Sequence, residues 1–255
     1  GGFPLTEERK TLISNFKGWG GCNAMLLPLE KDWKKLGESK EHLKAEKEVK
    51  KGYQELRNLF GDKRAKEMWE SITNASLTSF YTPQEVPNTF FEELKNQNKE
   101  REVIDFLNPC AGIGVYIDAC LKEFPKANVT AVEKDMLTSF VLTAKYKDTP
   151  NVQVFRKGFE EVKFNKQYDV IASNIPFGNF SVAFPQYDKK ITDKIHNFFF
   201  HHSKNLLKDN GILSFITSEG VFNSPENQIV REELLKNGKI TNFKVLPNDT
   251  FETTQ

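Results

Sequence analysis

The sequence predicts an α/β fold in its carboxyl-terminal part, preceded by a helical amino-terminal region. From about residue 100 onward, short apolar runs suited to buried strands alternate with segments of helical periodicity. That alternation is typical of a mostly parallel sheet with helices on both faces. Before about residue 80, apolar residues recur at helical spacing among many charges.

Residues 1–79 are expected to be helical. A first helix is predicted to begin after Thr6 and to reach Phe16. A long charged helix that ends at Gly61 is predicted by "SKEHLKAEKEVKKGYQELRNLFG" (39–61). A third helix is predicted by "DKRAKEMWESI" (62–72). The stretch "GWGG" (18–21) interrupts them. It is either a glycine loop held by a buried Trp19 or a contact with nucleic acid or another domain.

Residues 80–255 are expected to form the sheet domain. Strands are predicted at 103–108, 129–133, 152–156, 168–174, 212–217 and 240–246, with helical patterns at 113–124, 135–147, 191–207 and 225–237. Ligands of an open α/β sheet bind at the carboxyl ends of its strands. The residues that follow each strand are therefore the candidates for a site.

The bulk composition excludes several classes of protein. The three cysteines form no CxxC pair, so we expect free thiols in a reducing cytosol. No apolar run approaches the ~20 residues of a membrane span, and the start of the chain lacks the pattern of a signal peptide. The net charge of +1 favours no partner, because a balanced chain can still carry a local basic groove.

The first predicted strand ends in the glycine-bearing turn "NPCAGIG" (108–114). Glycines let a ligand approach the backbone closely. A dinucleotide-binding GxGxxG motif would need a third glycine at position 117, which holds Ile117, so that fingerprint fails. The turn is either a plain strand-to-helix connection or a different ligand loop.

The second and third strands end in acidic residues. Glu133 falls 19 residues after Gly114, where an acid can bind the hydroxyls of an adenosine ribose; a surface carboxylate is the alternative. After the third strand, "KGFEEV" could stack Phe159 on an adenine and offer Glu160 to its amino group. That stretch could equally be a polar loop.

The fourth strand runs into "ASNIPFGNF" (172–180). A turn needs only the asparagine, proline and glycine, and does not explain Phe177 at its tip. We interpret Asn174-Ile175-Pro176-Phe177 as a loop that binds a planar group through its amino nitrogen.

Together these motifs resemble the DNA adenine-N6 methyltransferases that use S-adenosyl-L-methionine (AdoMet). "FYTP" (80–83) is similar to the family's segment that covers the methionine end of the cofactor, and "NPCAGIG" is similar to its D-P-x-A-G-x-G loop. "VEKD" resembles the stretch with the ribose-binding acid, and "GFEE" resembles the acidic loop near the cofactor adenine. "SNIPFG" is similar to the catalytic N-P-P-[FY] motif. The resemblance implies a Rossmann-like class I methyltransferase sheet and AdoMet as cofactor.

The resemblance also assigns site residues. The implied catalytic residues are Asn174, Ile175, Pro176 and Phe177. The implied cofactor-binding residues are Tyr81, Thr82, Asn108, Pro109, Cys110, Ala111, Gly112, Gly114, Glu133, Lys134, Phe159, Glu160 and Asn174. No metal is implied.

The chemistry explains why these residue types are needed. The lone pair of an adenine amino group is delocalised into the ring, and accepting both N–H bonds frees it. The side-chain oxygen of Asn174 and the carbonyl of residue 175 can be the two acceptors. Phe177 can stack on the base, and such stacking contributes roughly 1–3 kcal/mol to binding. In duplex DNA the adenine must first be flipped out.

Two positions depart from the family pattern. Ile175 replaces the first proline of N-P-P-[FY], which keeps the carbonyl and loses the rigidity. Asn108 replaces the usual Asp, which keeps hydrogen bonds and loses the charge.

The stretch after the motif joins aromatics to basic residues, a combination that suits nucleic acid, although a mobile lid fits equally well. Its residues are Phe180, Phe184, Tyr187, Lys189 and Lys190. Three nearby histidines lie in a helical run without a matching ligand set, so we do not assign them to a metal. They are His196, His201 and His202.

The amino-terminal part is similar, more loosely, to large methylase–helicase proteins of bacterial mobile elements. The expected partners are DNA with a flipped adenine and further domains of a larger polypeptide. The family's sheet has seven strands, so we expect a domain that is incomplete after residue 255. The alternatives are a methyltransferase for RNA or a protein glutamine, and a non-catalytic DNA-binding segment. A nicotinamide-dependent oxidoreductase is a further, less favoured alternative.

Overall fold

The computed structural model describes residues 6–16, 40–78, 82–236, 238–247 and 250–251. Trp19 with the "GWGG" stretch, and Tyr81, lie outside the described residues. Among the described helices, none is long and apolar enough to cross a bilayer.

Five parallel strands form the sheet, in the order β3-β2-β1-β4-β5. They are β1 Asp105–Asn108, β2 Asn128–Val132, β3 Val152–Phe155, β4 Tyr168–Asn174 and β5 Leu207–Ile216. The predicted parallel α/β sheet is confirmed. The strand order reverses direction between β1 and β4, which is where a ligand crevice forms in such sheets.

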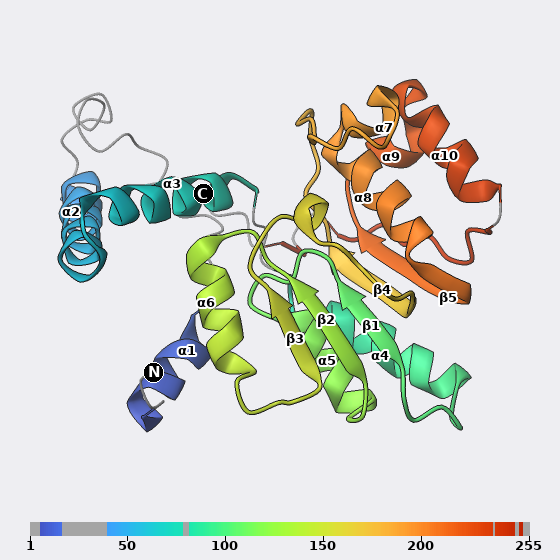
Figure 1. Ribbon diagram of the computed structural model, residues 1–255, viewed down its shortest axis with the longest axis horizontal. Helices are drawn as coiled ribbons and strands as arrows, with labels where there is room; N and C mark the ends of the chain where they lie inside the picture. The colour runs from blue at the N-terminus through green and yellow to red at the C-terminus, as the bar shows by residue number, and fades with distance from the viewer. Residues whose placement is uncertain (1–5, 17–39, 79–81, 237, 248–249, 252–255) are drawn as a thin grey trace.

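The side chains of each strand alternate between two cores. Phe106 points into the core under α4, α5 and α6, whereas its neighbour Leu107 points into the core under α8 and α10. Figure 1 shows these helices on opposite faces of the sheet. Their bounds are α4 Glu85–Gln97, α5 Val115–Glu123, α6 Met136–Lys145, α8 Ile195–Asn205 and α10 Gln228–Leu235.

Three local features differ from what was expected. Helix α4 was not expected, although it buries Phe91 and Leu94 against the sheet. The helix expected at 191–207 is divided into α7 Lys189–Thr192 and α8, and α9 Gly220–Asn223 precedes α10. The strand predicted at 240–246 is wrong: these residues are irregular and exposed, because they pair with no strand in the described structure.

The expected amino-terminal helices are present as α1 Glu7–Asn15, α2 Lys40–Phe60 and α3 Asp62–Thr78. Gly61, with φ +78°, makes the turn between α2 and α3. Helices α1 and α3 both pack against α6. Figure 1 shows α2 and α3 beyond β3, on the α6 side of the sheet.

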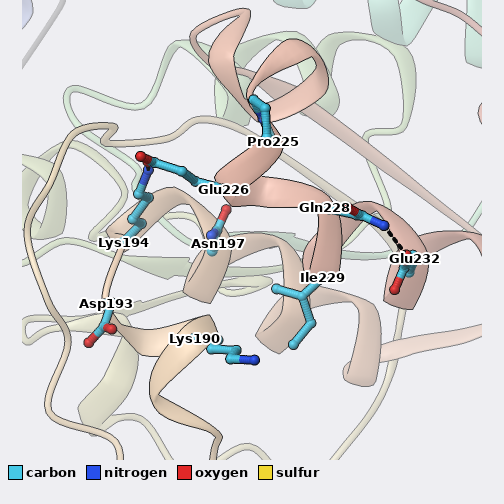
Figure 2. A pocket seen from close by; sticks show the side chains of 9 residues that line it. All are labelled: Lys190, Asp193, Lys194, Asn197, Pro225, Glu226, Gln228, Ile229 and Glu232. Carbon is cyan, nitrogen blue, oxygen red and sulfur yellow. Dashed lines mark hydrogen bonds and ion pairs between the residues drawn. The ribbon is translucent and has the colours of Figure 1, made fainter.

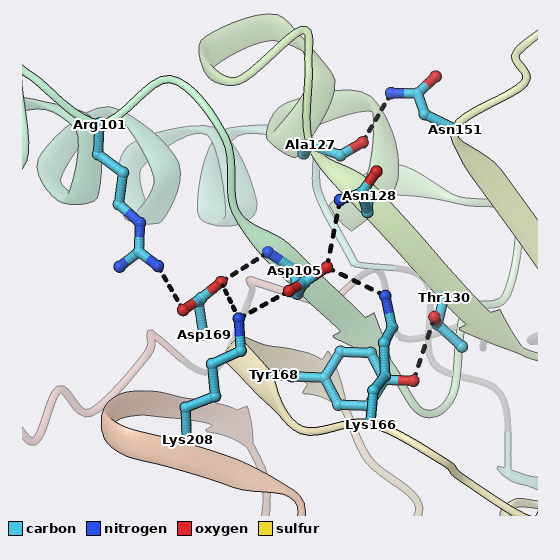
Figure 3. A network of polar contacts seen from close by, with 10 residues as sticks. All are labelled: Arg101, Asp105, Ala127, Asn128, Thr130, Asn151, Lys166, Tyr168, Asp169 and Lys208. Carbon is cyan, nitrogen blue, oxygen red and sulfur yellow. Dashed lines mark hydrogen bonds and ion pairs between the residues drawn. The ribbon is translucent and has the colours of Figure 1, made fainter.

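An ionic network joins the amino ends of the central strands (Figure 3). Lys208 bridges Asp105 at 2.7 Å and Asp169 at 3.0 Å, and Arg101 also pairs with Asp169. Partial burial alone would raise the pKa of Asp169, but hydrogen bonds from the Asp105 N–H, Lys208 and Arg101 outweigh it and hold the pKa below its usual range. The opposite end of the sheet carries the predicted site.

Candidate functional site

Polar residues meet at the carboxyl ends of β1, β2 and β4. Asn108 ends β1, Glu133 follows β2 and Asn174 ends β4. Parallel strands bring these three ends to the same edge of the sheet. The three residues thus lie at the edge of the sheet where the sequence placed the candidate site.

The two glycines of the β1–α5 loop have different roles. Both have positive φ, +53° at Gly112 and +89° at Gly114. A Cβ on Gly112 would meet nothing within 4 Å, whereas one on Gly114 would lie 2.5 Å from the Tyr146 hydroxyl. Gly112 thus leaves its backbone open to a ligand, and Gly114 permits close packing of α5 against α6.

Glu133 is buried, with 8% of its surface exposed. Its Oε2 accepts the Gly112 N–H at 2.7 Å, and its Oε1 accepts the Asp135 N–H at 2.7 Å. Burial raises the pKa of Glu133 to about 7, with a further contribution from the Asp135 charge, although the backbone N–H groups oppose both. The carboxylate is therefore fixed beside the open glycine.

Lys134 and Glu160 form an ion pair at 3.0 Å across the ends of β2 and β3. The Lys134 side chain remains 75% exposed and that of Glu160 is 22% exposed. In this conformation a carboxyl oxygen of Glu160 is occupied by the lysine.

Phe159 does not lie where an adenine could stack on it. Only 2% of its surface is exposed. Its ring packs against Phe164, Phe199 and His202 in the core beside α8. The stacking role expected for Phe159 is therefore corrected to a core role, since its apolar ring gains more from burial there than from the loop surface.

The amide of Asn108 explains the departure from Asp. Asn108 is fully buried, and its Nδ2 donates to the Ala172 carbonyl of β4 at 2.7 Å. An ionised Asp has no hydrogen to donate there. The Oδ1 of Asn108 is buried and has no hydrogen-bond partner in the described part of the chain, an unusual state for a polar atom.

The rest of the loop is tied to neighbouring strands. The Ala111 N–H donates to the Val132 carbonyl at 2.9 Å. The Ser173 hydroxyl, which is buried, donates to the Cys110 carbonyl at 2.8 Å. Ser173 was missed from the sequence; its position directly before Asn174 at a strand end was the available signal. Pro109 is buried within the same turn.

Asn174 meets the segment that precedes α4. Its Nδ2 donates to the Thr82 hydroxyl at 3.1 Å, across 92 positions of sequence. Thr82 is buried, with 6% exposed. The structure therefore brings together two residues that were assigned to one site from separate motifs.

Ile175 is anchored through its main chain and its side chain. Its N–H donates to the Ile216 carbonyl of β5 at 3.1 Å, and the side chain is 1% exposed. A proline could not make this hydrogen bond. Ile175 thus fixes the start of the loop by a contact that replaces the rigidity of proline.

The tip of the loop is supported by α8. Pro176 and Phe177 are partly exposed, and Gly178 follows with φ +133°. The Gly178 N–H donates to Nδ1 of His196 at 3.4 Å. His196 was expected only as a helix residue, and its contact with the loop could not be read from the sequence.

The aromatic stretch after the loop is only partly available to a ligand. Phe180 is 55% exposed, whereas Phe184 and Tyr187 pack against Phe198, and the Tyr187 hydroxyl bonds His202 at 2.7 Å. Phe184 and Tyr187 thus bury part of their rings in the core over α8, and the nucleic-acid contact of this stretch stays a prediction. Lys189 and Lys190 remain exposed on α7.

A pocket of about 570 Å³ lies between α7, the start of α8 and α10 (Figure 2). Charged and amide side chains dominate its lining, including Lys190, Lys194 and Glu226. None of the residues assigned to the cofactor or to catalysis lines it. It is thus separate from the candidate site at the carboxyl ends of the strands.

A model of the protein family described as "Methyltransferase small domain" matches residues 85–245. The chain is 28% identical over 177 residues to "Modification methylase CviBIII" from Paramecium bursaria Chlorella virus NC1A. The match covers 68% of this chain and 45% of that protein. The chain thus spans less than half the length of this curated relative.

Solved structures share the fold. A putative class I S-adenosylmethionine-dependent methyltransferase from Listeria monocytogenes has a TM-score of 0.54 at 14% identity, over 84% of this chain and 69% of that chain. A type I restriction-modification system methyltransferase subunit from Streptococcus thermophilus has a TM-score of 0.54 at 12% identity, over 90% of this chain and 64% of that chain.

Proposed function

The chain belongs to the methyltransferase small domain family, and we propose that it transfers a methyl group from AdoMet to the N6 amino group of adenine in DNA. Methyl transfer from AdoMet follows from the family and the fold. The choice of adenine and of DNA is the proposal. The observation that carries the transfer to an amino group is the hydrogen bond that joins Asn174 of the "SNIPFG" loop to Thr82.

The residues at the strand ends fit the cofactor. Gly112 leaves space beside its backbone, and Glu133 lies next to it with a carboxylate that can accept ribose hydroxyls. The buried Oδ1 of Asn108 is an acceptor without a described partner. A buried water between this oxygen and a ligand at the strand ends would supply the missing hydrogen bond.

When bound, AdoMet would supply a methyl group on a positively charged sulfur: the amino nitrogen would bond to the methyl carbon, the carbon–sulfur bond would break to release the neutral thioether, and the methylated nitrogen would lose one proton to water. The protein mainly has to align the nitrogen with the methyl group, at roughly 3–3.5 Å. The bond to Thr82 orients the Asn174 amide, so that Oδ1 is the atom that can accept an adenine N–H. The second acceptor would be the carbonyl of Ile175, a residue whose own N–H is anchored to β5.

Phe177 and Phe180 extend this site towards solvent. Phe177 is partly exposed at the loop tip, and Phe180 is 55% exposed two residues after Gly178. Aromatic faces of this kind stack on unpaired bases. We assign Phe177 to the flipped adenine and Phe180 to a neighbouring base.

The names of the similar proteins support DNA as the substrate. One relative is a modification methylase and one structural neighbour is a restriction-modification methyltransferase subunit. Together with the resemblance of "SNIPFG" to the N-P-P-[FY] motif, these names support DNA as the substrate proposed for this chain.

The test uses the purified chain and AdoMet labelled in its methyl group. The substrates are mixed-sequence DNA free of methylated adenine, total RNA and a protein extract, each followed by digestion to monomers. Label in N6-methyladenine from DNA is the expected result. Label in N4-methylcytosine, RNA or protein would contradict the proposed substrate, and AdoMet binding without any transfer would favour the non-catalytic alternative.

A further inference from the structure

The first turn of α6 is held by a residue of the amino-terminal helical region. The Ser71 hydroxyl in α3 donates to Oδ2 of Asp135 at 2.6 Å and accepts the Met136 N–H at 3.0 Å. Asp135 and Met136 lie 64 and 65 positions further along the chain. One hydroxyl therefore bonds both the capping residue and the first residue of α6.

Asp135 connects this hydroxyl to Glu133. As the cap of α6, it accepts the Thr138 N–H on Oδ1 at 2.7 Å, while its own N–H donates to Oε1 of Glu133 at 2.7 Å. Asp135 and Glu133 are both buried, with 7% and 8% exposed. The series Ser71–Asp135–Glu133 thus leads from the helical region to the proposed ribose-binding carboxylate.

An apolar contact holds the two parts together beside this series. Val49, Trp69 and Ile72 form a small buried core between α2 and α3, and Leu137 of α6 packs against it. Burial of these side chains excludes water from the neighbouring hydrogen bonds, which strengthens them. The helical region and α6 are therefore held together by a packed apolar interface.

We propose that Ser71 is a positioning residue for Glu133 and that the helical region (α2 and α3) is in this way part of the AdoMet site. The inference rests on the proposed cofactor role of Glu133. Without the Ser71 hydroxyl, Oδ2 of Asp135 and the Met136 N–H lose their partner. The turn from 133 to 136 then becomes free to shift, and Glu133 shifts with it.

The experiment is calorimetric titration of the full chain with AdoMet. Ser71→Ala should raise the dissociation constant about 3- to 10-fold, because only part of the free energy of the two lost hydrogen bonds is transmitted to Glu133, and Ser71→Thr should restore it. Thr143→Ala is the matched control: its hydroxyl donates to the Ser139 carbonyl within α6 at 2.7 Å, on an exposed position. It should leave the dissociation constant unchanged.

A double-mutant cycle separates positioning from a general loss of structure. If Ser71 acts through Glu133, Ser71→Ala should add no further loss to Glu133→Ala. An equal loss in both backgrounds, or an unchanged dissociation constant for Ser71→Ala, would overturn the inference while the proposed function stands. Absence of AdoMet binding by the unaltered chain would overturn both.

Discussion

Asn174 donates a hydrogen bond from Nδ2 to the hydroxyl of Thr82 at 3.1 Å. Neither residue can be linked to the other from local sequence, because 92 positions separate them. The bond connects the segment before α4 to the end of β4 and fixes the orientation of the Asn174 amide. The proposed transfer chemistry depends on that orientation.

Asn174→Ala should lower methyl transfer at least about 100-fold, because the acceptor that aligns the adenine nitrogen is lost. The AdoMet dissociation constant should change less than about threefold. Single-turnover transfer and calorimetry measure the two effects. Asn179→Ala, at an exposed amide just beyond the loop, is the control. Transfer that persists in Asn174→Ala would contradict the assigned role.

Glu133 should make AdoMet binding depend on pH near neutrality. Its pKa is raised to about 7, so the carboxylate is mostly protonated at pH 6 and mostly ionised at pH 8. The ionised form is the better acceptor for ribose hydroxyls. Affinity should therefore fall about tenfold from pH 8 to pH 6.

Calorimetry across this pH range provides the measurement. Glu133→Gln removes the titrating group and should give weaker binding with a flatter pH profile. If the pH profile of the wild-type protein matched that of the Gln variant, Glu133 would not be the residue that binds the ribose.

Ile175→Pro should destabilise the fold, even though proline occupies this position in the N-P-P-[FY] motif that the loop resembles. The substitution removes the N–H that donates to the Ile216 carbonyl of edge strand β5. We expect a loss of about 1–2 kcal/mol in the free energy of unfolding, measured by urea denaturation. Ile175→Val keeps the N–H and is the control. Equal stability of the Pro variant would mean that this bond contributes little.

Asn108→Asp should destabilise the fold more at high pH than at low pH. Burial raises the pKa of a carboxyl at this position, and only its protonated form can donate to the Ala172 carbonyl. The contribution to stability is thus present at low pH and is lost as the pH rises through the folded-state pKa.

We expect a cost of about 1–3 kcal/mol at pH 8, and a smaller one at pH 5, in urea denaturation. Asn96→Asp, at an exposed position in α4, should be neutral at both. A cost that does not change with pH would show that the amide hydrogen is not the reason for Asn108.

The sequence by itself determined the first four strands and the polar residues at their ends. Consecutive apolar residues mark buried parallel strands locally, so β4 was predicted with the bounds that it has, Tyr168–Asn174. The glycine turn and Glu133 then followed from their positions after β1 and β2. Helix α4 was missed, since the pattern around Pro87 was not interpreted as the first turn of a helix.

Only the tertiary structure decided which of the candidate site residues are buried in the core. Phe159 and Phe184 resemble exposed loop aromatics in sequence, but packing against α8 buries the first and partly buries the second. The residues at 240–246 have strand-like composition, yet a strand needs a hydrogen-bonded neighbour. The contacts of Asn108 with Ala172 and of Ser71 with Asp135 likewise join segments distant in sequence. Propensity and periodicity are local, whereas hydrogen-bond partners are fixed by the packing of the whole chain.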